Sequence, residues 1–287
     1  MTESSGWLSV QVVTPPDAWD AAASVLMEHG CTGVELREAP PRVVGYLPES
    51  QQEQLPSIRA QLDRFPEFGL PPVLEVRVEP VAAQQWQRAW RRYFRSRHYG
   101  HRLRVQPSWS RRKPQPDEIV IVLDPGMAFG TGNHPTTALC LELLEKYLQP
   151  GSRVADIGTG TGILAIAAAK LGAKEVVAVD NDPLAVRVAR SNIERNGVAS
   201  CVQLIEGDGW QVLQGVFELI VCNILSGFLV QSAPLVPRYL RVGGIYIVSG
   251  FIGRNARAVR DAIENAGLRL EEVRKRRSWV AAVFRRV

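Results

Sequence analysis

Residues able to bind a nucleotide and to orient an amine occur at three places in the second half of the chain. The first is the segment Asp156-Ile-Gly158-Thr-Gly160-Thr-Gly162, which follows an apolar run and opens a helical one. Glycines at this spacing allow a tight turn from strand to helix and let the backbone come close to a ligand. A dinucleotide pattern needs its third glycine at position 163, which is Ile163. The segment therefore favours a nucleotide site other than a pyrophosphate site.

An acidic residue, Asp180, ends the next apolar run, 22 residues after Gly158 (180 − 158). A carboxylate at this place can accept hydrogen bonds from both ribose hydroxyls of an adenosine group. The alternative is that Asp180 caps the helix beginning near Pro183, although Asp182 is better placed for that role. Asp208, in the sequence EGDGW, fits a contact with adenine or a plain turn equally well.

Asn223 directly follows the apolar run FELIVC. We expect it to close the fourth strand of a parallel sheet at its carboxyl end, where open α/β sheets place their ligand crevice. The amide oxygen can accept a hydrogen bond from an amine while the NH2 group bonds a cofactor, so one side chain can hold two reactants in line. The alternative is an ordinary turn residue at a strand end.

The elements that position these residues alternate regularly from residue 153 onward. This alternation predicts a doubly wound α/β domain, with a parallel sheet covered by helices on both faces. Two final strand-like segments are expected to form an antiparallel pair that closes the sheet. The segments expected to be strands or helices are VADI, 161–171, EVVAVD, 183–196, VQLI, FELIVCN, a helix from about 226, IYIVSG, a helix over 255–266, and strands over 268–273 and 279–284.

The first 80 residues have a different pattern. Their strand and helix signals follow the order β-α-β-β-α-β, which is typical of a smaller α+β domain with a ferredoxin-like fold. The expected elements are strands over 7–14, 33–36, 43–47 and 73–78 and helices over 18–29 and 50–62.

Charge divides the chain into three parts. Residues 1–80 carry 5 Arg against 12 Asp and Glu (−7), residues 81–115 carry 10 Lys and Arg against no acid (+10), and the remainder is +2, which together give the net +5. We expect a substrate-recognition domain over 1–80, a basic linker over 81–115 and a catalytic domain over 116–287. The acidic domain is suited to a basic partner.

Within the linker, residues 84–97 place aromatic side chains on one face of a helix and arginines on the rest. Basic and aromatic residues together can bind nucleic acid. An amphipathic helix that packs its aromatic face between two domains is the favoured interpretation, so we expect no requirement for nucleic acid.

The composition is that of an ordinary globular protein, with 46% hydrophobic and 22% charged residues. The start of the chain has no secretory signal pattern, and no apolar stretch is long enough to span a bilayer. We therefore expect a cytoplasmic monomer that does not bind a membrane. The four cysteines, Cys31, Cys140, Cys201 and Cys222, lack metal-ligand spacing. They predict buried free thiols and no metal site.

Several longer motifs resemble the ribosomal protein L11 methyltransferase family. They are LDPGMAFGTGNHPTT over 123–137, DIGTGTGILAIAAAKLGA, VDNDPLAV, NIERNGV and VCNIL. The resemblance extends over 85–287, and the acidic N-terminal part matches the family's recognition domain in size and pattern. FGTGNHPTT is specific to this family, whereas the alternating glycines occur throughout class I methyltransferases.

The resemblance implies an S-adenosylmethionine site formed by Thr137, Gly158, Asp180 and Asn223, with Asn223 also catalytic. We add Asp156 and Gly160, which belong to the same glycine motif. Read independently, Thr137 can instead cap the following helix. His134 is expected to make a loop hydrogen bond rather than to act in catalysis.

The implied reaction is methyl transfer to lysine side chains and the N-terminal amine of ribosomal protein L11. Since a lysine has a pKa of about 10.4 in water, the amine must lose a proton, and burial near a positive sulfonium lowers its pKa without a dedicated base.

Three alternatives remain at this point. They are a methyltransferase for another protein or a small molecule, a nicotinamide-dependent oxidoreductase, which would need the missing third glycine, and a noncatalytic RNA-binding module.

Overall fold

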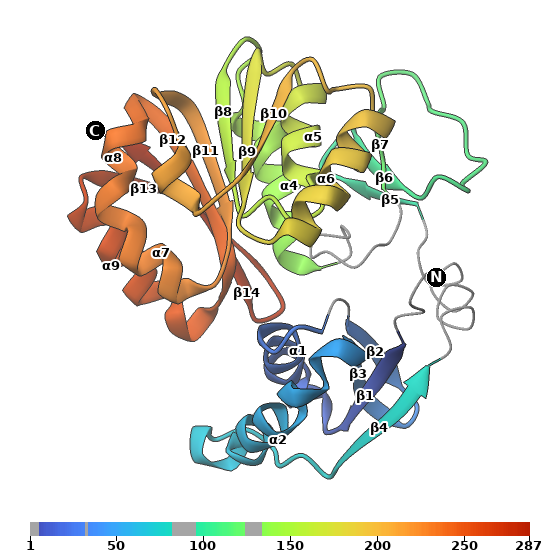
Figure 1. Ribbon diagram of the computed structural model, residues 1–287. Helices are drawn as coiled ribbons and strands as arrows, with labels where there is room; N and C mark the ends of the chain where they lie inside the picture. Colours follow the sequence, from blue (N-terminus) through green and yellow to red (C-terminus); the bar gives the residue numbers. More distant parts are fainter. Residues whose placement is uncertain (1–5, 32–33, 82–95, 124–133) are drawn as a thin grey trace. The chain divides into compact units, whose positions relative to one another are not determined.

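The computed structural model describes residues 6–31, 34–81, 96–123 and 134–287 (Figure 1). The chain forms two compact units, Met1–Tyr93 and Phe94–Val287. The expected aromatic face of the linker helix, over 84–97, lies almost entirely outside the described residues.

The first unit contains a four-stranded antiparallel sheet. Its strands are β1 (Trp7–Val13), β2 (Val34–Glu38), β3 (Pro41–Pro48) and β4 (Glu75–Val81), in the order β2-β3-β1-β4. Helices α1 (Trp19–Glu28) and α2 (Leu55–Asp63) contribute to the core of this unit, together with alternate residues of β1 and β3. The predicted ferredoxin-like order β-α-β-β-α-β is thereby confirmed.

One expected helix of this unit is divided in two. Residues 50–62 were predicted as a single helix, but the structure has a 3-10 segment, η2 (Glu49–Gln54), followed by α2. Within η2 the backbone is interrupted at Gln51, whose φ of −113° and ψ of 19° are not helical. Pro56 is in the first turn of α2, where its missing N–H costs no helical hydrogen bond. The proline therefore marks the start of a second helix.

The second unit begins with a small three-stranded sheet that the sequence did not predict. Its strands are β5 (Arg97–Tyr99), β6 (Leu103–Gln106) and β7 (Ile119–Val122). The fully buried Arg104 forms an ion pair with Glu118 at 3.1 Å. Strands β5 and β6 lie within 81–115, the range expected to be a linker.

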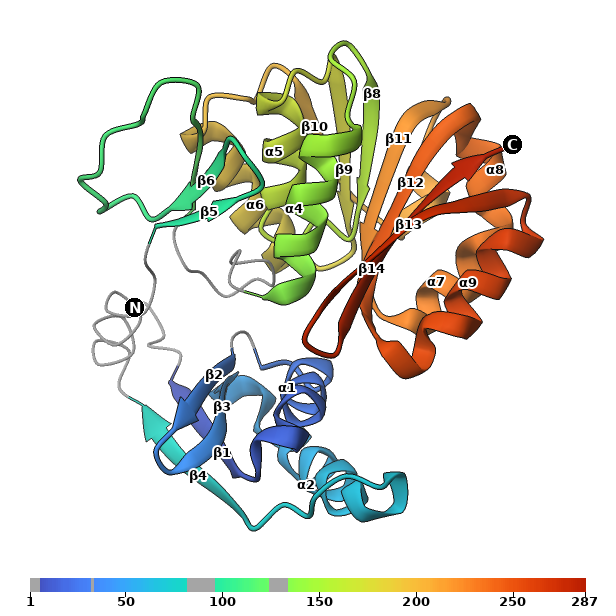
Figure 2. The same cartoon turned by 180° about the vertical axis from the view of Figure 1, so that it is seen from behind.

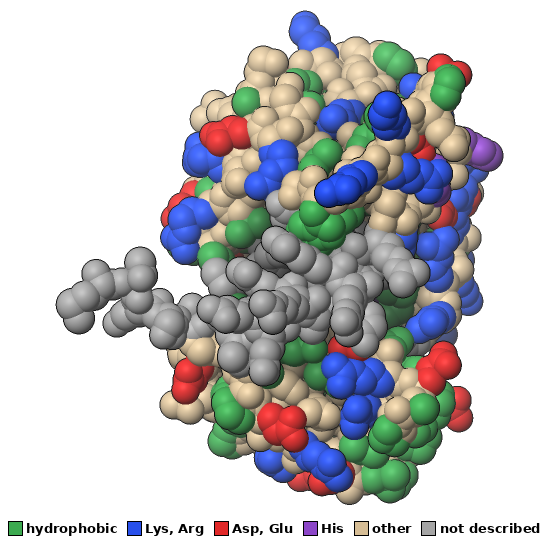
Figure 3. All heavy atoms as spheres, turned by 90° about the vertical axis from the view of Figure 1, so that its right-hand side faces the viewer, with side chains coloured by type: hydrophobic (Ala, Val, Ile, Leu, Met, Phe, Trp, Pro, Cys, Tyr) green, Lys and Arg blue, Asp and Glu red, His purple; other side chains and the backbone are tan. Residues whose placement is uncertain are grey.

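Basic side chains are prominent on this second unit. Figure 3 shows Lys and Arg side chains spread over the part of the unit that it draws in colour. Arg102, Arg111 and Arg112 are among the exposed residues that precede β7. Part of the positive charge of residues 81–115 is thus presented to solvent by this segment.

The large sheet of the second unit has seven strands in the order β10-β9-β8-β11-β12-β14-β13. They are β8 (Arg153–Ile157), β9 (Glu175–Asp180), β10 (Val202–Glu206), β11 (Phe217–Asn223), β12 (Leu240–Ile252), β13 (Leu268–Arg276) and β14 (Trp279–Arg286). Strands β8 to β12 run parallel, and β14 is antiparallel to both β12 and β13. The predicted parallel sheet and its closing antiparallel pair are confirmed.

Helices cover both faces of this sheet (Figures 1 and 2). Helices α4 (Pro135–Tyr147), α5 (Ile163–Lys170) and α6 (Pro183–Arg195) pack on one face. Helices α7 (Ser226–Ser232), α8 (Val236–Tyr239) and α9 (Ala256–Asn265) pack on the other. Among the helices of the described segments, none combines the length and the apolar character needed to cross a bilayer.

Candidate active site

The glycine segment forms the turn between β8 and α5, as its spacing predicted. Gly158, Gly160 and Gly162 have φ values of 72°, 57° and 81°, in the left-handed region that glycine adopts at little cost. The N–H groups of Gly158 and Thr159 both donate to the carbonyl of Val179 at 2.9 Å. The turn is therefore fixed to the neighbouring strand β9.

The first glycine is also a point of close approach. A Cβ at Gly158 would lie 2.3 Å from Cδ1 and 2.6 Å from Cγ1 of Ile224, which follows Asn223. Atoms that are not bonded to each other do not approach this closely, so any side chain at Gly158 would displace Ile224. The glycine thus brings the turn against the end of β11.

Asp156 lies beneath the turn and is fully buried. Its Oδ2 accepts hydrogen bonds from Thr159 Oγ1 at 2.6 Å and from the N–H of Ala165 at 3.0 Å. Its Oδ1 has no hydrogen-bond partner among the described residues. Burial raises the pKa of this carboxyl to about 7, although the bonds from Thr159 and Ala165 act to lower it. Asp156 therefore ties the turn to the start of α5.

Asp180 ends β9 and faces the second glycine. Its Oδ2 accepts from the N–H of Gly160 at 2.7 Å, and its Oδ1 accepts from the N–H of Asp182 at 3.1 Å. The cap of α6 is Asp182, whose Oδ1 accepts from the N–H of Leu184 at 2.8 Å. The helix-capping alternative for Asp180 is thus taken by Asp182, and the half-buried Asp180 carboxylate is left at the turn.

Thr137 and Asn223 are brought together although they are far apart in the sequence. Both side chains are buried, and Asn223 Nδ2 donates to Thr137 Oγ1 across 3.5 Å. Within the described part of the chain, Asn223 Oδ1 has no partner. A buried amide oxygen of this kind can accept a hydrogen bond from an incoming group.

His134, not Thr137, is the N-cap of α4. Its Nδ1 lies 3.4 Å from the N–H of Thr136 and 2.7 Å from the Thr136 hydroxyl. Its ring packs edge-on against Trp279, with the centroids 4.5 Å apart. Those contacts give His134 the structural role that was expected of it.

Other residues of the predicted site are less closely involved. Asp208 is exposed, and its Oδ2 accepts from Gln211 Nε2 at 2.7 Å at the start of a 3-10 turn. The glycines of the family-specific segment, Gly130 and Gly132, lie outside the described residues, as does Gly126 before it. The structure adds Thr159 and Ile224, which no sequence signal had singled out.

These groups share one edge of the sheet, at the carboxyl ends of β8, β9 and β11. The strand order reverses direction between β8 and β11, and open α/β sheets bind ligands outside such a switch point. The arrangement can hold a nucleoside between a glycine turn and a carboxylate, with the amide of Asn223 beside it.

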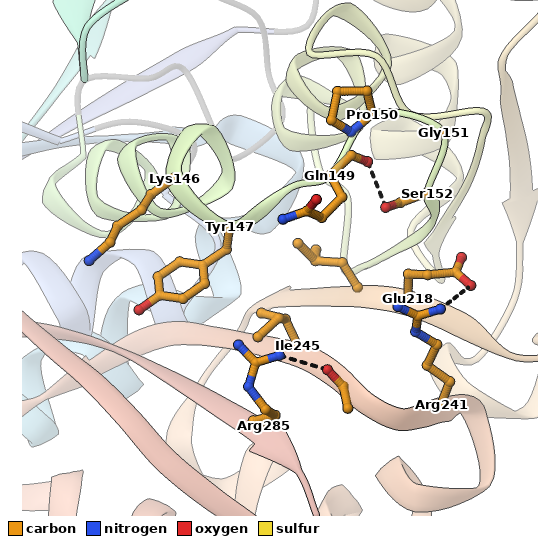
Figure 4. A pocket seen from close by; sticks show the side chains of 12 residues that line it. Lys146, Tyr147, Gln149, Pro150, Gly151, Ser152, Glu218, Arg241, Ile245 and Arg285 are labelled. Carbon is orange, nitrogen blue, oxygen red and sulfur yellow. Dashed lines mark hydrogen bonds and ion pairs between the residues drawn. The ribbon is translucent and has the colours of Figure 1, made fainter.

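A cavity of about 460 Å³ lies at the opposite edge of the sheet (Figure 4). Its lining comes from the C-terminal end of α4, the loop before β8 and the starts of β11 and β12. Its polar groups bond one another or nearby residues: Lys146 Nζ lies 2.7 Å from Glu272, and Arg285 donates to the carbonyl of Gly243 at 2.8 Å. This cavity is therefore separate from the predicted nucleotide site.

Comparison with known proteins agrees with this geometry. The family model described as "Ribosomal protein L11 methyltransferase (PrmA)" matches residues 6–287. The chain belongs to this family. It is 40% identical to the ribosomal protein L11 methyltransferase of Pelotomaculum thermopropionicum over 97% of this chain and 98% of that protein. It is 42% identical to that of Symbiobacterium thermophilum, over 90% and 86% respectively.

A solved structure of the same L11 methyltransferase family resembles the chain as well. The crystal structure of a ribosomal protein L11 methylase from Lactobacillus delbrueckii subsp. bulgaricus aligns with a TM-score of 0.64 and 32% identity. The alignment covers 68% of this chain and 100% of that one. The class I methyltransferase fold predicted for the second unit is thus confirmed.

Proposed function

We propose that this chain transfers methyl groups from S-adenosylmethionine to amino groups of ribosomal protein L11. The observation that carries this proposal is the Asn223 amide, which is buried beside Thr137 at the carboxyl end of β11. Its oxygen has no partner within the described residues. An acceptor fixed in this way can orient an amine toward a reactive group held at the glycine turn. Family membership supports L11 as the substrate.

The residues of the site fit the cofactor. Gly158, Gly160 and Gly162 all have positive φ, and a turn built of such glycines lets a ligand approach its backbone closely. The proposed contacts are Thr137, Gly158, Asp180 and Asn223, with Gly160 and Asp156 shaping the turn. Asp180 is suited to ribose hydroxyls. When bound, S-adenosylmethionine supplies a methyl group on a positively charged sulfur, which leaves as a neutral thioether.

The chain's part in the reaction is to orient and desolvate the amine. A lysine has a pKa of about 10.4 in water, and its nitrogen reacts only after losing a proton. The apolar residues around β11 exclude water, and burial disfavours the ammonium form. Asn223 Oδ1 then accepts an N–H of the neutral amine and directs its lone pair along the line of attack.

We assign no general base in this site. His134, three residues before Thr137, is the candidate base that the sequence suggests, but it bonds Thr136 and packs against Trp279. The proton of the amine is released to solvent as the amine becomes buried, because burial disfavours the ammonium form. Positioning and desolvation therefore account for the catalysis in this proposal.

The acidic N-terminal part is proposed to recognise the substrate. Its charge of −7 over residues 1–80 attracts basic ribosomal proteins. Such a recognition domain, joined by the segment 81–115, can present several lysines and the N-terminal amine to one catalytic site. Because the substrate is a ribosomal protein, we propose a cytoplasmic location.

Mass spectrometry of purified ribosomal protein L11 tests the proposal. L11 is incubated with the chain and S-adenosylmethionine, with one control lacking the cofactor and another containing the Asn223→Ala variant. We expect mass to increase in steps of one methyl group in the complete reaction, not at all without the cofactor, and much more slowly with Asn223→Ala. No added mass, with cofactor binding intact, would leave a methyltransferase for another protein or a small molecule as the alternative.

A further inference from the structure

One face of helix α6 joins two separate parts of the site. Ala189, Asn192 and Asn196 follow one another at spacings of three and four residues, which places them on the same side of a helix. The sequence contains the two asparagines within NIERNG, a motif to which the catalytic proposal gives no role. Both asparagines donate through Nδ2 to backbone carbonyls, and Asn192 Oδ1 also accepts from Arg195 Nη1 at 3.4 Å.

The first contact is with the glycine turn. Asn192 is 3% exposed, and its Nδ2 donates to the carbonyl of Thr161, between Gly160 and Gly162, at 2.9 Å. Ala189 packs one helical turn earlier: a Cβ added at Gly162 would lie 3.3 Å from its Cβ. The helix thus fixes the second half of the turn through both a hydrogen bond and close packing.

The second contact is with the end of β7. Asn196 Oδ1 accepts from the N–H of Val122 at 2.8 Å, and Asn196 Nδ2 donates to the carbonyl of Val122 at 2.7 Å. The next residue, Leu123, bonds β6 through its N–H to Gln106. Asn196 therefore bonds both the N–H and the carbonyl of Val122. These are the groups that a neighbouring strand would bond on this side of β7.

The two contacts are connected. Asn196 Nδ2 also donates to the carbonyl of Asn192 at 2.8 Å, so one amide group bridges β7 and the residue that holds the glycine turn. The segment that follows β7 leads to α4, which begins at Pro135 and carries Thr137. The position of Val122 consequently fixes where the chain leaves for the Thr137 side of the site.

We propose that Asn192 and Asn196 are positioning residues that hold the glycine turn and the end of β7 in one fixed arrangement. This inference rests on the proposed function in one respect: the arrangement matters because S-adenosylmethionine binds there. Neither side chain is a catalytic residue. Their loss should weaken cofactor binding while leaving turnover at saturating cofactor nearly unchanged.

The binding test uses calorimetric titration of the full chain with S-adenosylmethionine. Asn196→Ala removes the two bonds to Val122 and the bridge to Asn192, so we expect the Kd to rise about tenfold. Asn196→Asp keeps the acceptor for the Val122 N–H but turns a carboxylate oxygen toward two carbonyls, so its Kd should rise as well. Asn265→Ala, at an exposed asparagine in the last turn of α9, is the matched control and should bind as the wild type does.

General destabilisation is excluded by a second control. Val259→Ala truncates a side chain that is 1% exposed in the core on the other face of the sheet. It should lower the Tm without raising the Kd for S-adenosylmethionine. An unchanged Kd in Asn196→Ala, or an equal rise in a Val259→Ala variant of similar Tm, would overturn the proposal.

Hydrogen exchange tests the connection without cofactor or substrate. In Asn196→Ala, which loses the bonds to Val122 and to the Asn192 carbonyl, amide exchange should accelerate at Val122 and across 158–162. Asn192→Ala keeps that backbone carbonyl and should accelerate exchange across 158–162, because it loses the bond to Thr161. If Asn196→Ala accelerates exchange only at Val122, the two parts are not coupled and the proposal is wrong. Failure to methylate L11 by a wild-type chain that binds S-adenosylmethionine would contradict the proposed function and leave this inference standing.

Discussion

At the scale of single residues, the site depends on two buried polar side chains with unequal surroundings. Asn223 has one amide hydrogen directed at Thr137 and an oxygen without a partner among the described residues. Asp156 Oδ2 accepts two hydrogen bonds, whereas Asp156 Oδ1 accepts none from the residues that the structure describes. Unpartnered buried atoms are costly, so a ligand that bonds Asn223 Oδ1 or a proton on Asp156 would relieve that cost.

Replacing Asn223 with Ala should lower kcat by about 100-fold, because the amine loses the group that orients it. The Kd for S-adenosylmethionine should change much less, since the glycine turn and Asp180 remain. Steady-state kinetics on ribosomal protein L11, with separate cofactor titrations, measure both quantities. Turnover that survives in Asn223→Ala would remove Asn223 from the mechanism, and Asn265→Ala provides the unaffected control.

Asp156 should make stability depend on pH. Its folded-state pKa of about 7 lies above the ordinary value of 3.8 because burial disfavours the carboxylate. The folded state therefore binds this proton more tightly than the unfolded state does. The contribution to stability is fully present below the unfolded pKa and is lost as pH rises through the folded pKa.

The test compares the wild type with Asp156→Asn, which keeps the shape and cannot ionise. Chemical denaturation without cofactor, from pH 5 to pH 8, gives the free energy of unfolding of each. The wild type should lose stability relative to Asp156→Asn as the pH rises over this range. Parallel curves would show that Asp156 does not titrate there.

At the scale of elements, α6 contacts both the glycine turn and the end of β7. The cap at the start of this helix should therefore stabilise the helix as a whole. Asp182 is its N-cap, and loss of such a cap costs about 1 kcal/mol. Asp182→Ala should lower the free energy of unfolding by about that amount. Denaturation of Asp261→Ala, at an exposed acid inside α9, is the comparison, and an equal loss there would argue against a capping effect.

The short strands and the long-range side-chain contacts are the features that could not be predicted from the sequence. The positions of Gly158, Asp180 and Asn223 at strand ends followed from apolar runs and their terminating residues. Strands β5 to β7 have three or four residues each, and the arginines of β5 and β6 fall within the basic segment that was expected to be a linker. The contacts of Asn192 and Asn196 were not predictable, because their partners Thr161 and Val122 lie 31 and 74 residues earlier in the chain and only tertiary packing brings them together. The change from η2 to α2 just before Pro56 did have a signal in the sequence, the proline itself.

At the scale of the whole molecule, charge is distributed unevenly along the chain. Reversing two exposed acids of the first unit, Glu38→Lys with Asp63→Lys, changes the charge of residues 1–80 from −7 to −3, since each reversal adds 2. The KM for ribosomal protein L11 should rise by about tenfold at low salt and less at high salt, because screening weakens long-range attraction.

The matched control for this prediction is Glu194→Lys with Asp261→Lys, which makes the same change in net charge on exposed acids of the second unit. Its KM for L11 should stay close to that of the wild type. Equal effects of the two pairs would show that total charge, rather than the acidic unit, attracts the substrate. The kcat of both variants should be unchanged.

The strand order of the large sheet bears on how the protein is made. Strand β14, formed by residues 279–286, lies between β12 and β13, so neither neighbour can pair fully until those residues have been synthesised. The first unit pairs strands only from residues 7–81 and can fold early, since domains generally fold as units in the order of synthesis. During translation the acidic unit is therefore complete well before the catalytic sheet. A nascent chain would be able to fold the part that we propose for recognition before it could methylate anything.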